Sequence, residues 1–230
     1  PKMRVRFSTS NPQDLTLDVV KTMAKYPNIC NHIHLPVQSG SNRILKEMNR
    51  LHTREAYFEL IDNIRKIIPN CAISQDMIVG FPTETEDDFQ DTVALMEYNF
   101  GYMYKYSERP GTMAGRNMKD DVPEETKKRR LQDIVDLQRK HSEIRTKEWL
   151  NTTVEVLIEK ESKKSAEQWS GRTPQNIVCV FPKAHYKIGD FVNVKVKNCT
   201  SATLIGVAIP LTSPLSPKGG TRTRKKIINI

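Results

Sequence analysis

The sequence contains no long apolar run and no apolar leader. Its apolar stretches are strand-sized, and no charged, then apolar, then small-residue pattern opens the chain, whereas a membrane helix needs about 20 apolar residues. We therefore predict no membrane span and no secretion signal, and we expect a cytoplasmic protein. The chain begins at Pro1 and is in strand-like alternation by Val5 and Phe7, so we expect that its natural beginning is missing, although processing would also produce such a start.

Cysteine is also scarce. The four cysteines, Cys30, Cys71, Cys179 and Cys199, lie far apart, with no C-x-x-C pair and no histidine at metal-ligand spacing. This spacing predicts buried or incidental thiols and no metal site in this chain. A disulfide framework is not expected in a chain of this length without a secretion signal.

Charge of both signs is abundant, but it is unevenly distributed. Of the formal charge of +9, residues 1–149 carry +1, residues 150–210 carry +3 and residues 211–230 carry +5. A solvated basic surface would explain this excess. A small basic module after a nearly neutral domain is also typical of a protein that binds a phosphate backbone.

The first half alternates strand-like and helix-like periods, which indicates an α/β protein with a parallel sheet. Ser41, Thr53 and the Thr85-to-Asp88 capping box mark the starts of three helices. The periodicity predicts strands over 4–8, 29–37, 72–79 and 101–107, and helices over 17–24, 42–48, 54–68 and 86–98.

The second half changes character. A long amphipathic helix is predicted over 122–150, as a strut between two domains. Short β runs follow at 154–158, 177–181, 191–196 and 202–208, and four or five such strands indicate a small barrel. Residues beyond 210 are basic and poor in apolar side chains, so we expect disorder there.

Small and polar residues follow each of the four predicted strands of the first half. They occupy 8–10, 38–41, 80–84 and 107–112. In a parallel sheet or barrel, ligands bind beyond the carboxyl ends of the strands. One such loop alone is more often a polar turn, but four on one rim favour a ligand site.

Four segments carry a resemblance to a known family. They are RVRFSTSNP (4–12), HLPVQSGS (34–41), DMIVGFPTET (76–85) and YSERPGT (106–112). In this order and spacing they resemble the radical S-adenosylmethionine (SAM) methylthiotransferases, most closely the bacterial tRNA-2-methylthio-N6-dimethylallyladenosine synthases. The resemblance extends nearly to Pro210.

The resemblance implies an α/β fold, the second half of a partial (β/α) radical SAM barrel, followed by a small all-β barrel called TRAM that binds RNA. It places the half barrel with its strut helix at 1–148, TRAM at 149–211 and a basic tail at 212–230. A half barrel would expose a strand edge, so either a second polypeptide or a longer chain is expected to complete it.

The implied activity is addition of a methylthio group to C2 of N6-isopentenyl-adenosine, next to the tRNA anticodon, by radical chemistry. The implied cofactors are SAM and two [4Fe-4S] clusters. The family's C-x-x-x-C-x-x-C motif is absent, so the clusters are expected to be ligated outside this chain, by a missing N-terminal portion. This chain alone is expected to be inactive, and the tRNA anticodon stem-loop is its implied partner.

Site residues follow from the same resemblance, without any residue assigned to catalysis. Polar and backbone contacts to SAM are expected from Gln38, Ser39 and Gly40, with Ser8 and Asp76 as further candidates. The strand edge from Ile78 to Gly80 would contact the adenine, and Arg109 would bind the SAM carboxylate or an RNA phosphate. RNA contacts are expected from Arg172, Lys183, Tyr186, Lys187, Lys195 and Lys197, although a solvated basic face explains each residue alone.

Two alternatives stay open. Within the family, the target could be threonylcarbamoyl-adenosine in tRNA or an aspartate of a ribosomal protein. From another class, the chain could be a non-catalytic RNA-binding protein.

Overall fold

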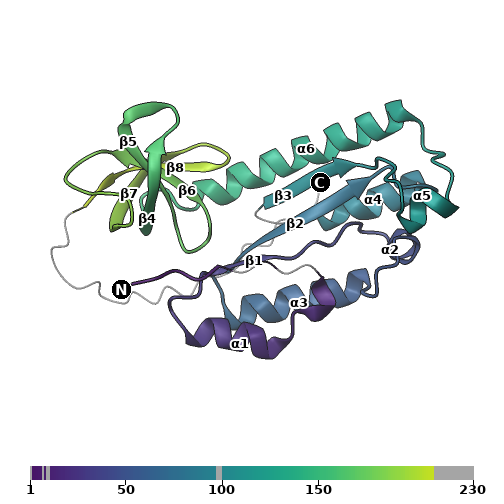
Figure 1. The fold of residues 1–230 in the computed structure, drawn as a ribbon, viewed down its shortest axis with the longest axis horizontal. Coiled ribbons are helices and arrows are strands. Elements are labelled where there is room, and N and C mark those ends of the chain that lie inside the picture. The colour runs from purple at the N-terminus through teal and green to yellow at the C-terminus, as the bar shows by residue number, and fades with distance from the viewer. Residues whose placement is uncertain (1, 7, 9–10, 97–99, 210–230) are drawn as a thin grey trace.

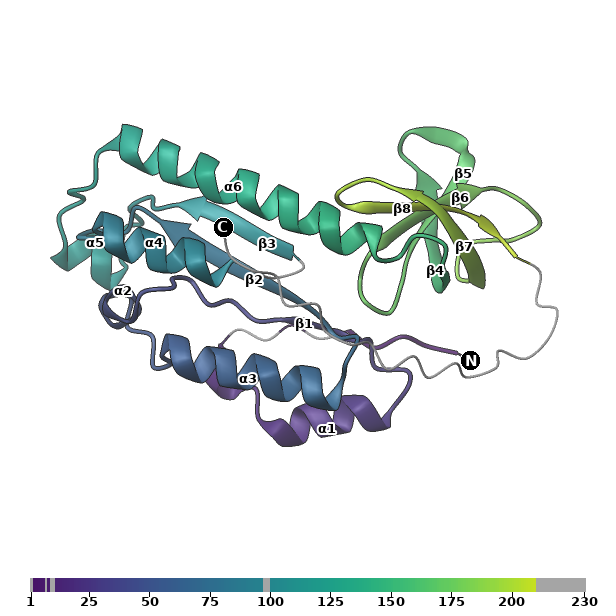
Figure 2. The same ribbon diagram turned by 180° about the vertical axis from the view of Figure 1, so that it is seen from behind.

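The computed structural model describes residues 2–6, 8, 11–96 and 100–209. An α/β unit and a small β barrel lie side by side, and a long helix, α6 (Glu124–Lys147), leads from one to the other (Figures 1 and 2). The elements of the α/β unit are η1 (Pro12–Asp14), α1 (Leu17–Lys25), β1 (His32–His34), α2 (Asn42–Glu47), α3 (Arg54–Ile67), β2 (Ala72–Val79), α4 (Glu86–Leu95), β3 (Phe100–Lys105) and α5 (Met113–Asn117).

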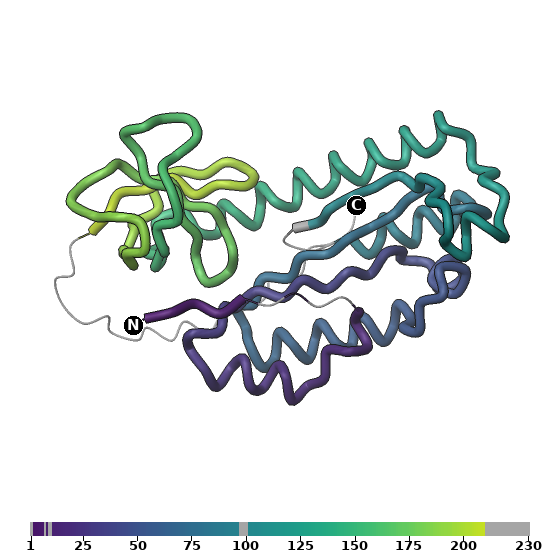
Figure 3. Tube along the Cα trace, in the orientation of Figure 1, coloured from purple at the N-terminus to yellow at the C-terminus, as the bar shows by residue number. Residues whose placement is uncertain are grey.

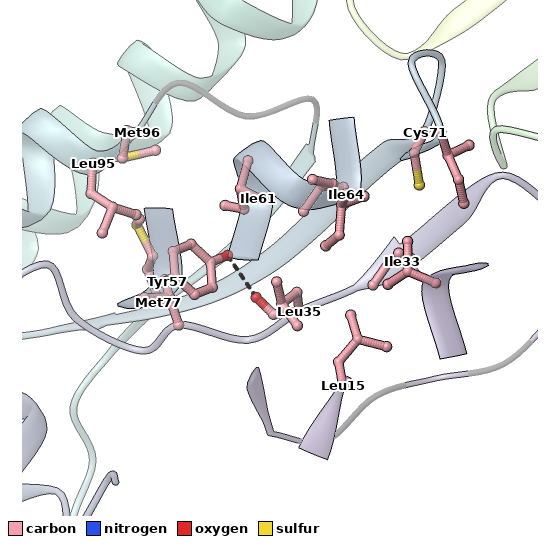
Figure 4. Close-up of a cluster of buried hydrophobic side chains, with 14 of the residues drawn as sticks. Leu15, Ile33, Leu35, Tyr57, Ile61, Ile64, Cys71, Met77, Leu95 and Met96 are labelled. Carbon is pink, nitrogen blue, oxygen red and sulfur yellow. Dashed lines mark hydrogen bonds between the residues drawn. The ribbon is translucent and has the colours of Figure 1, made fainter. Parts of the chain in front are cut away.

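The sheet of this unit is parallel, in the order β1-β2-β3. One face is covered by α1, α3, α4 and α6, and the core lies between them; Figure 4 shows it, with the Tyr57 hydroxyl donating to the Leu35 carbonyl at 2.8 Å. The opposite face carries polar and aromatic side chains. On it, Asp76 pairs in register with Tyr102, and Ile78 with Tyr104, and both tyrosines are exposed.

The small barrel is closed, in the order β4-β5-β6-β8-β7. Its strands are β4 (Thr153–Ser162), β5 (Ser165–Arg172), β6 (Val178–Pro182), β7 (Phe191–Cys199) and β8 (Thr203–Ala208). Only β6 and β8 run parallel to each other. Val156, Phe181 and Val194 are among the residues of its own apolar core, which is separate from that of the α/β unit.

The structure differs from the expected elements in several places, and one of them is helix α5, which was not expected. Of the strand expected at 4–8, the described residues form one parallel bridge, between Val5 and Ile29. The strand expected at 29–37 shortens to β1. After the Leu35 N–H bonds to the Ser74 carbonyl, the next bond to β2 comes from Gln38 instead of Val37, so the register shifts and pairing resumes as one bridge between Gln38 and Met77. Strand β5 was not expected. The tail expected to be disordered lies outside the described residues.

The two units meet through the amino-terminal segment as well as through α6, as the chain trace in Figure 3 shows. The Arg4 guanidinium donates to the carbonyl and carboxylate oxygens of Glu155, both at 3.0 Å, and also to the Arg172 carbonyl. Arg6 donates to the Thr173 carbonyl at 3.0 Å. At the end of α6, the Thr146 hydroxyl reaches the Ser201 carbonyl at 3.1 Å.

Candidate functional site

The carboxyl ends of β1, β2 and β3 lie at the end of the sheet remote from the small barrel, beside α2 and α5 (Figure 1). Gln38 follows β1 and has a φ of 76°. Its N–H donates to the Asp76 carbonyl and its carbonyl accepts from the Ile78 N–H, both at 2.9 Å. The Gln38 side-chain amide makes no hydrogen bond to any described residue, so it is available to a ligand.

Ser39 and Gly40 pack the same loop against α4. The Ser39 hydroxyl lies 3.3 Å from the Thr92 hydroxyl, which also accepts from the Gly40 N–H at 2.9 Å. A Cβ at Gly40 would overlap the Asp91 carbonyl. These two candidates for SAM contacts are therefore already bonded within the protein, and their local role is to close the loop onto the helix.

Gly80 and Glu84 form the turn after β2. Gly80 has a φ of +71°, and a Cβ there would overlap the Lys127 side chain of α6. The Gly80 N–H donates to Glu84 at 2.6 Å, and Arg130 donates to the same carboxylate at 2.7 Å. Burial raises the pKa of Glu84, and the bonds from Gly80 and Arg130 oppose that shift. This buried pairing fixes the turn beside Ile78.

Four polar side chains form a row across the open face of the sheet. Ser74 Oγ lies 3.1 Å from His32 Nε2 and 3.0 Å from His34 Nδ1. His34 Nε2 in turn lies 3.5 Å from Asp76 Oδ2. Burial lowers the pKa of His32 to about 4, with Arg6 adding to the effect, so His32 is neutral at neutral pH. The row runs from the side of the small barrel toward the rim and ends at Asp76.

Arg50 is a residue that the rim pattern did not indicate. Burial lowers the pKa of Arg50, while the Asp76 carboxylate raises it. Its half-buried guanidinium makes no ion pair or side-chain hydrogen bond within the described ranges. Arg50 follows α2 rather than a strand, so only the folded chain brings it toward Asp76. A desolvated cation near Gln38 and Asp76 suits the binding of a carboxylate.

The remaining rim candidates are exposed. Ser8 makes no side-chain contact to the described part of the chain. Arg109 lies on the loop after β3, where its carbonyl accepts from the Thr112 N–H at 3.3 Å. Its guanidinium has no partner among the described residues. The structure thus brings Gln38, Asp76 and Ile78 together but leaves Ser8 and Arg109 in solvent.

The basic residues of the small barrel divide into several groups. Lys183 pairs with Glu161 and lies 4.5 Å from the centre of the Trp169 ring, and Lys195 donates to the Asn151 carbonyl. Tyr186 packs against His185, with 4.3 Å between ring centres, and Lys187 and Lys197 are exposed. Arg172 lines a pocket of about 340 Å³ together with Lys160, Lys163 and Lys164, three lysines that were not among the expected RNA contacts.

The described residues do not fit an iron–sulfur cluster. Among them, no three His, Cys, Asp or Glu side chains gather as a metal site. The four cysteines are free, and Cys30, Cys71 and Cys179 are buried. Burial raises the pKa of Cys71 and of Cys179 to about 12, which disfavours the thiolate that ligates iron.

Within the described residues, no helix is long and apolar enough to cross a membrane.

Comparison with known proteins gives two family matches. Residues 1–96 match the Radical SAM superfamily, and residues 148–209 match the TRAM domain. Among solved structures, a coproporphyrinogen III oxidase from Escherichia coli, described as a radical SAM enzyme, superposes with a TM-score of 0.52 at 15% identity. That match covers 91% of this chain and 52% of the other, and it supports the fold alone.

Similar curated proteins are tRNA-2-methylthio-N(6)-dimethylallyladenosine synthases. The relative from Christiangramia forsetii is 71% identical over 214 residues, covering 92% of this chain and 44% of the relative. The relative from Flavobacterium johnsoniae is 69% identical over 216 residues, covering 93% and 45%. The chain thus spans less than half the length of these relatives. It carries a segment that matches the Radical SAM superfamily, followed by a segment that matches the TRAM domain.

Proposed function

We propose that this chain is part of a methylthiotransferase that adds a methylthio group to C2 of N6-isopentenyl-adenosine next to the tRNA anticodon. The observation that carries the proposal is the 71% identity to a synthase of that name, over 92% of this chain. Identity this high over both domains favours this target over threonylcarbamoyl-adenosine or a ribosomal protein. We also propose the division into 1–148, 149–211 and 212–230, and action in the cytoplasm.

The rim of the parallel sheet is the proposed SAM-binding wall. Gln38 offers a free amide, Asp76 a carboxylate for hydroxyl or amine donors, and Ile78 an apolar edge for the adenine. Arg50 joins them as the cation for the SAM carboxylate, a role for which Arg109 remains the exposed alternative. Gly80, Ser39 and Gly40 hold the surrounding turns, and Ser8 is a further contact. In this family SAM supplies the radical and the methyl group.

The clusters are proposed to be ligated by residues outside this chain. The described cysteines do not fit that role, and the similar synthases are more than twice as long as the matched region. The RNA-binding role falls to the TRAM domain, with Arg172, Lys183, Tyr186, Lys187, Lys195 and Lys197 as proposed contacts to the anticodon stem-loop.

Deletion of the gene that encodes this chain tests the activity. Mass spectrometry of nucleosides from the deletion strain should show N6-isopentenyl-adenosine without its methylthio group, and the intact gene should restore it. Gln38→Ala and Arg50→Ala variants should restore it poorly. Loss of the methylthio group from threonylcarbamoyl-adenosine instead would assign the other tRNA target, and an unchanged nucleoside profile would contradict the proposal.

A further inference from the structure

A pocket lies on the outer face of the small barrel, away from the rim of the parallel sheet. It has a volume of about 340 Å³ and is bordered by β4, β5, β6 and β8. Along β6, Cys179 and Phe181 point into the barrel core, whereas Val178 and Val180 line the pocket. Ile205 of β8 lines it in the same way. The floor is therefore apolar, although it lies on the outward face of the strands.

The border of this pocket is positively charged. Lys160, Lys163, Lys164 and Arg172 line it, against a single carboxylate, that of Glu159, which lies 3.7 Å from Arg172. Within the described ranges, none of the three lysines forms an ion pair. Lys183, by contrast, is paired with Glu161. The pocket therefore presents uncompensated positive charge above an apolar floor.

This combination matches the chemistry of a nucleotide. A base has two apolar faces that pack on aliphatic side chains, and its phosphates need cations at the edge of the same site. Hydroxyl and amide groups of Thr203 and Gln168 also line the pocket and can hydrogen-bond the edge of a base. The volume lies within the usual range of small-ligand pockets, roughly 300–1,000 Å³.

We propose that this pocket binds one unpaired nucleotide of the RNA, with the base on Val178, Val180 and Ile205 and the flanking phosphates against Lys160, Lys163 and Lys164. The proposal rests on the proposed function and specifies where the TRAM domain binds its RNA substrate. Arg4 holds the carbonyl of Arg172, so a nucleotide in the pocket has a fixed position relative to the α/β unit. The pocket would thereby set the register of the RNA.

Salt-dependent binding of an unmodified tRNA transcript to the 230-residue chain tests the charged border. The double variant Lys160→Glu and Lys164→Glu should weaken binding at least about 10-fold and reduce the slope of log K against log salt by about 2. The control, Lys25→Glu with Lys66→Glu, reverses two exposed lysines on the outer helices and should change the affinity less than about twofold under the same salt conditions.

A second variant tests the floor without altering charge. Val180→Trp should fill the pocket and weaken binding several-fold while leaving the salt slope unchanged, because the number of phosphate contacts stays the same. Circular dichroism establishes that each variant keeps its fold. If the wild-type chain binds tRNA and the pocket variants match the control, the pocket proposal is wrong and the proposed function stands. If the wild-type chain does not bind tRNA, the proposed RNA-binding role of its TRAM domain is wrong, and the pocket proposal is wrong with it.

Discussion

Gly80 joins the rim to helix α6 by close packing. It combines a φ of +71° with contact to Lys127, whose ammonium is held 2.5 Å from Asp120. Gly111 has a similar φ of +84° but no atom near its missing Cβ. We expect Gly80→Ala to lower the free energy of unfolding by about 2–4 kcal/mol and Gly111→Ala by about 1 kcal/mol. If urea titrations showed the same loss of unfolding free energy for Gly80→Ala and Gly111→Ala, the Lys127 side chain would move away from the new Cβ at no cost in stability.

His32 gives the chain a pH response of its own. Its pKa is about 4 in the folded protein and near 6.5 when unfolded, so between these values the unfolded chain binds the extra proton. Stability contributed by the neutral His32 should therefore fall as the pH drops from 6.5 toward 4. His32→Gln keeps a donor toward Ser74 but cannot titrate. In urea titrations, the free energy of unfolding should fall less from pH 7 to pH 5 for His32→Gln than for the wild type. An equal fall in both proteins would refute this role.

At the scale of elements, helix α4 depends on one carboxylate. Asp88 closes the capping box with Thr85 and accepts from the Ser41 hydroxyl at 2.6 Å and from Arg43. Burial alone would raise the pKa of Asp88, but the hydrogen bonds from Arg43, Ser41 and Thr85 outweigh it and hold the pKa below its ordinary range. The same carboxylate thus caps α4 and ties the start of α2 to it.

Asp88→Asn should lower the free energy of unfolding by about 1–2 kcal/mol at pH 7. Because the folded pKa is depressed, this contribution is complete above about pH 4 and is lost as the pH falls further. The gap between wild type and variant should therefore close in acid, measured by thermal unfolding across pH 7 to 3. Asp91→Asn, which breaks the ion pair of a half-exposed carboxylate with Arg54, should cost less than about 1 kcal/mol.

Local signals explain which elements could be predicted from the sequence. Ser41, Thr53 and Thr85 cap their helices as expected, because a cap depends only on the next three residues. Strand β5, with the sequence SAEQWSGR, was missed, because its polar residues become strand only by pairing with β4 and β6. Cap signals are therefore reliable, whereas strands of mixed polarity depend on distant partners.

The candidate site shows the same division. Gln38 and Gly80 stand directly after strands and could be selected from the sequence. Arg50 and Lys160 could not be selected from the sequence. Arg50 follows a helix, Lys160 lies within a strand, and each reaches its site only through tertiary packing. Packing alone also decides which hydroxyls of the rim are already hydrogen-bonded inside the protein, as the Ser39 hydroxyl is.

At the scale of the whole molecule, Arg4 connects the two units. Its side chain is 6% exposed, whereas Lys2, which contacts the same Glu155, is 58% exposed. Arg4→Ala should weaken the docking by about 2 kcal/mol, since it leaves buried carbonyl oxygens unpaired, and Lys2→Ala by much less. Faster hydrogen exchange near Arg172 and a larger radius of gyration in X-ray scattering should appear only with Arg4→Ala. If Arg4→Ala gave the same hydrogen exchange and radius of gyration as Lys2→Ala, α6 alone would position the small barrel.

The closed strand order of the small barrel also constrains how the protein folds. β7 pairs with β4, and β8 must fit between β6 and β7. During synthesis the barrel therefore cannot close until Ala208 has left the ribosome. The partners of Arg4 lie more than 150 residues further along the chain, so its contacts form late, as distant contacts generally do. Until then the two units can fold separately, and the small barrel takes its orientation only in the last step of folding.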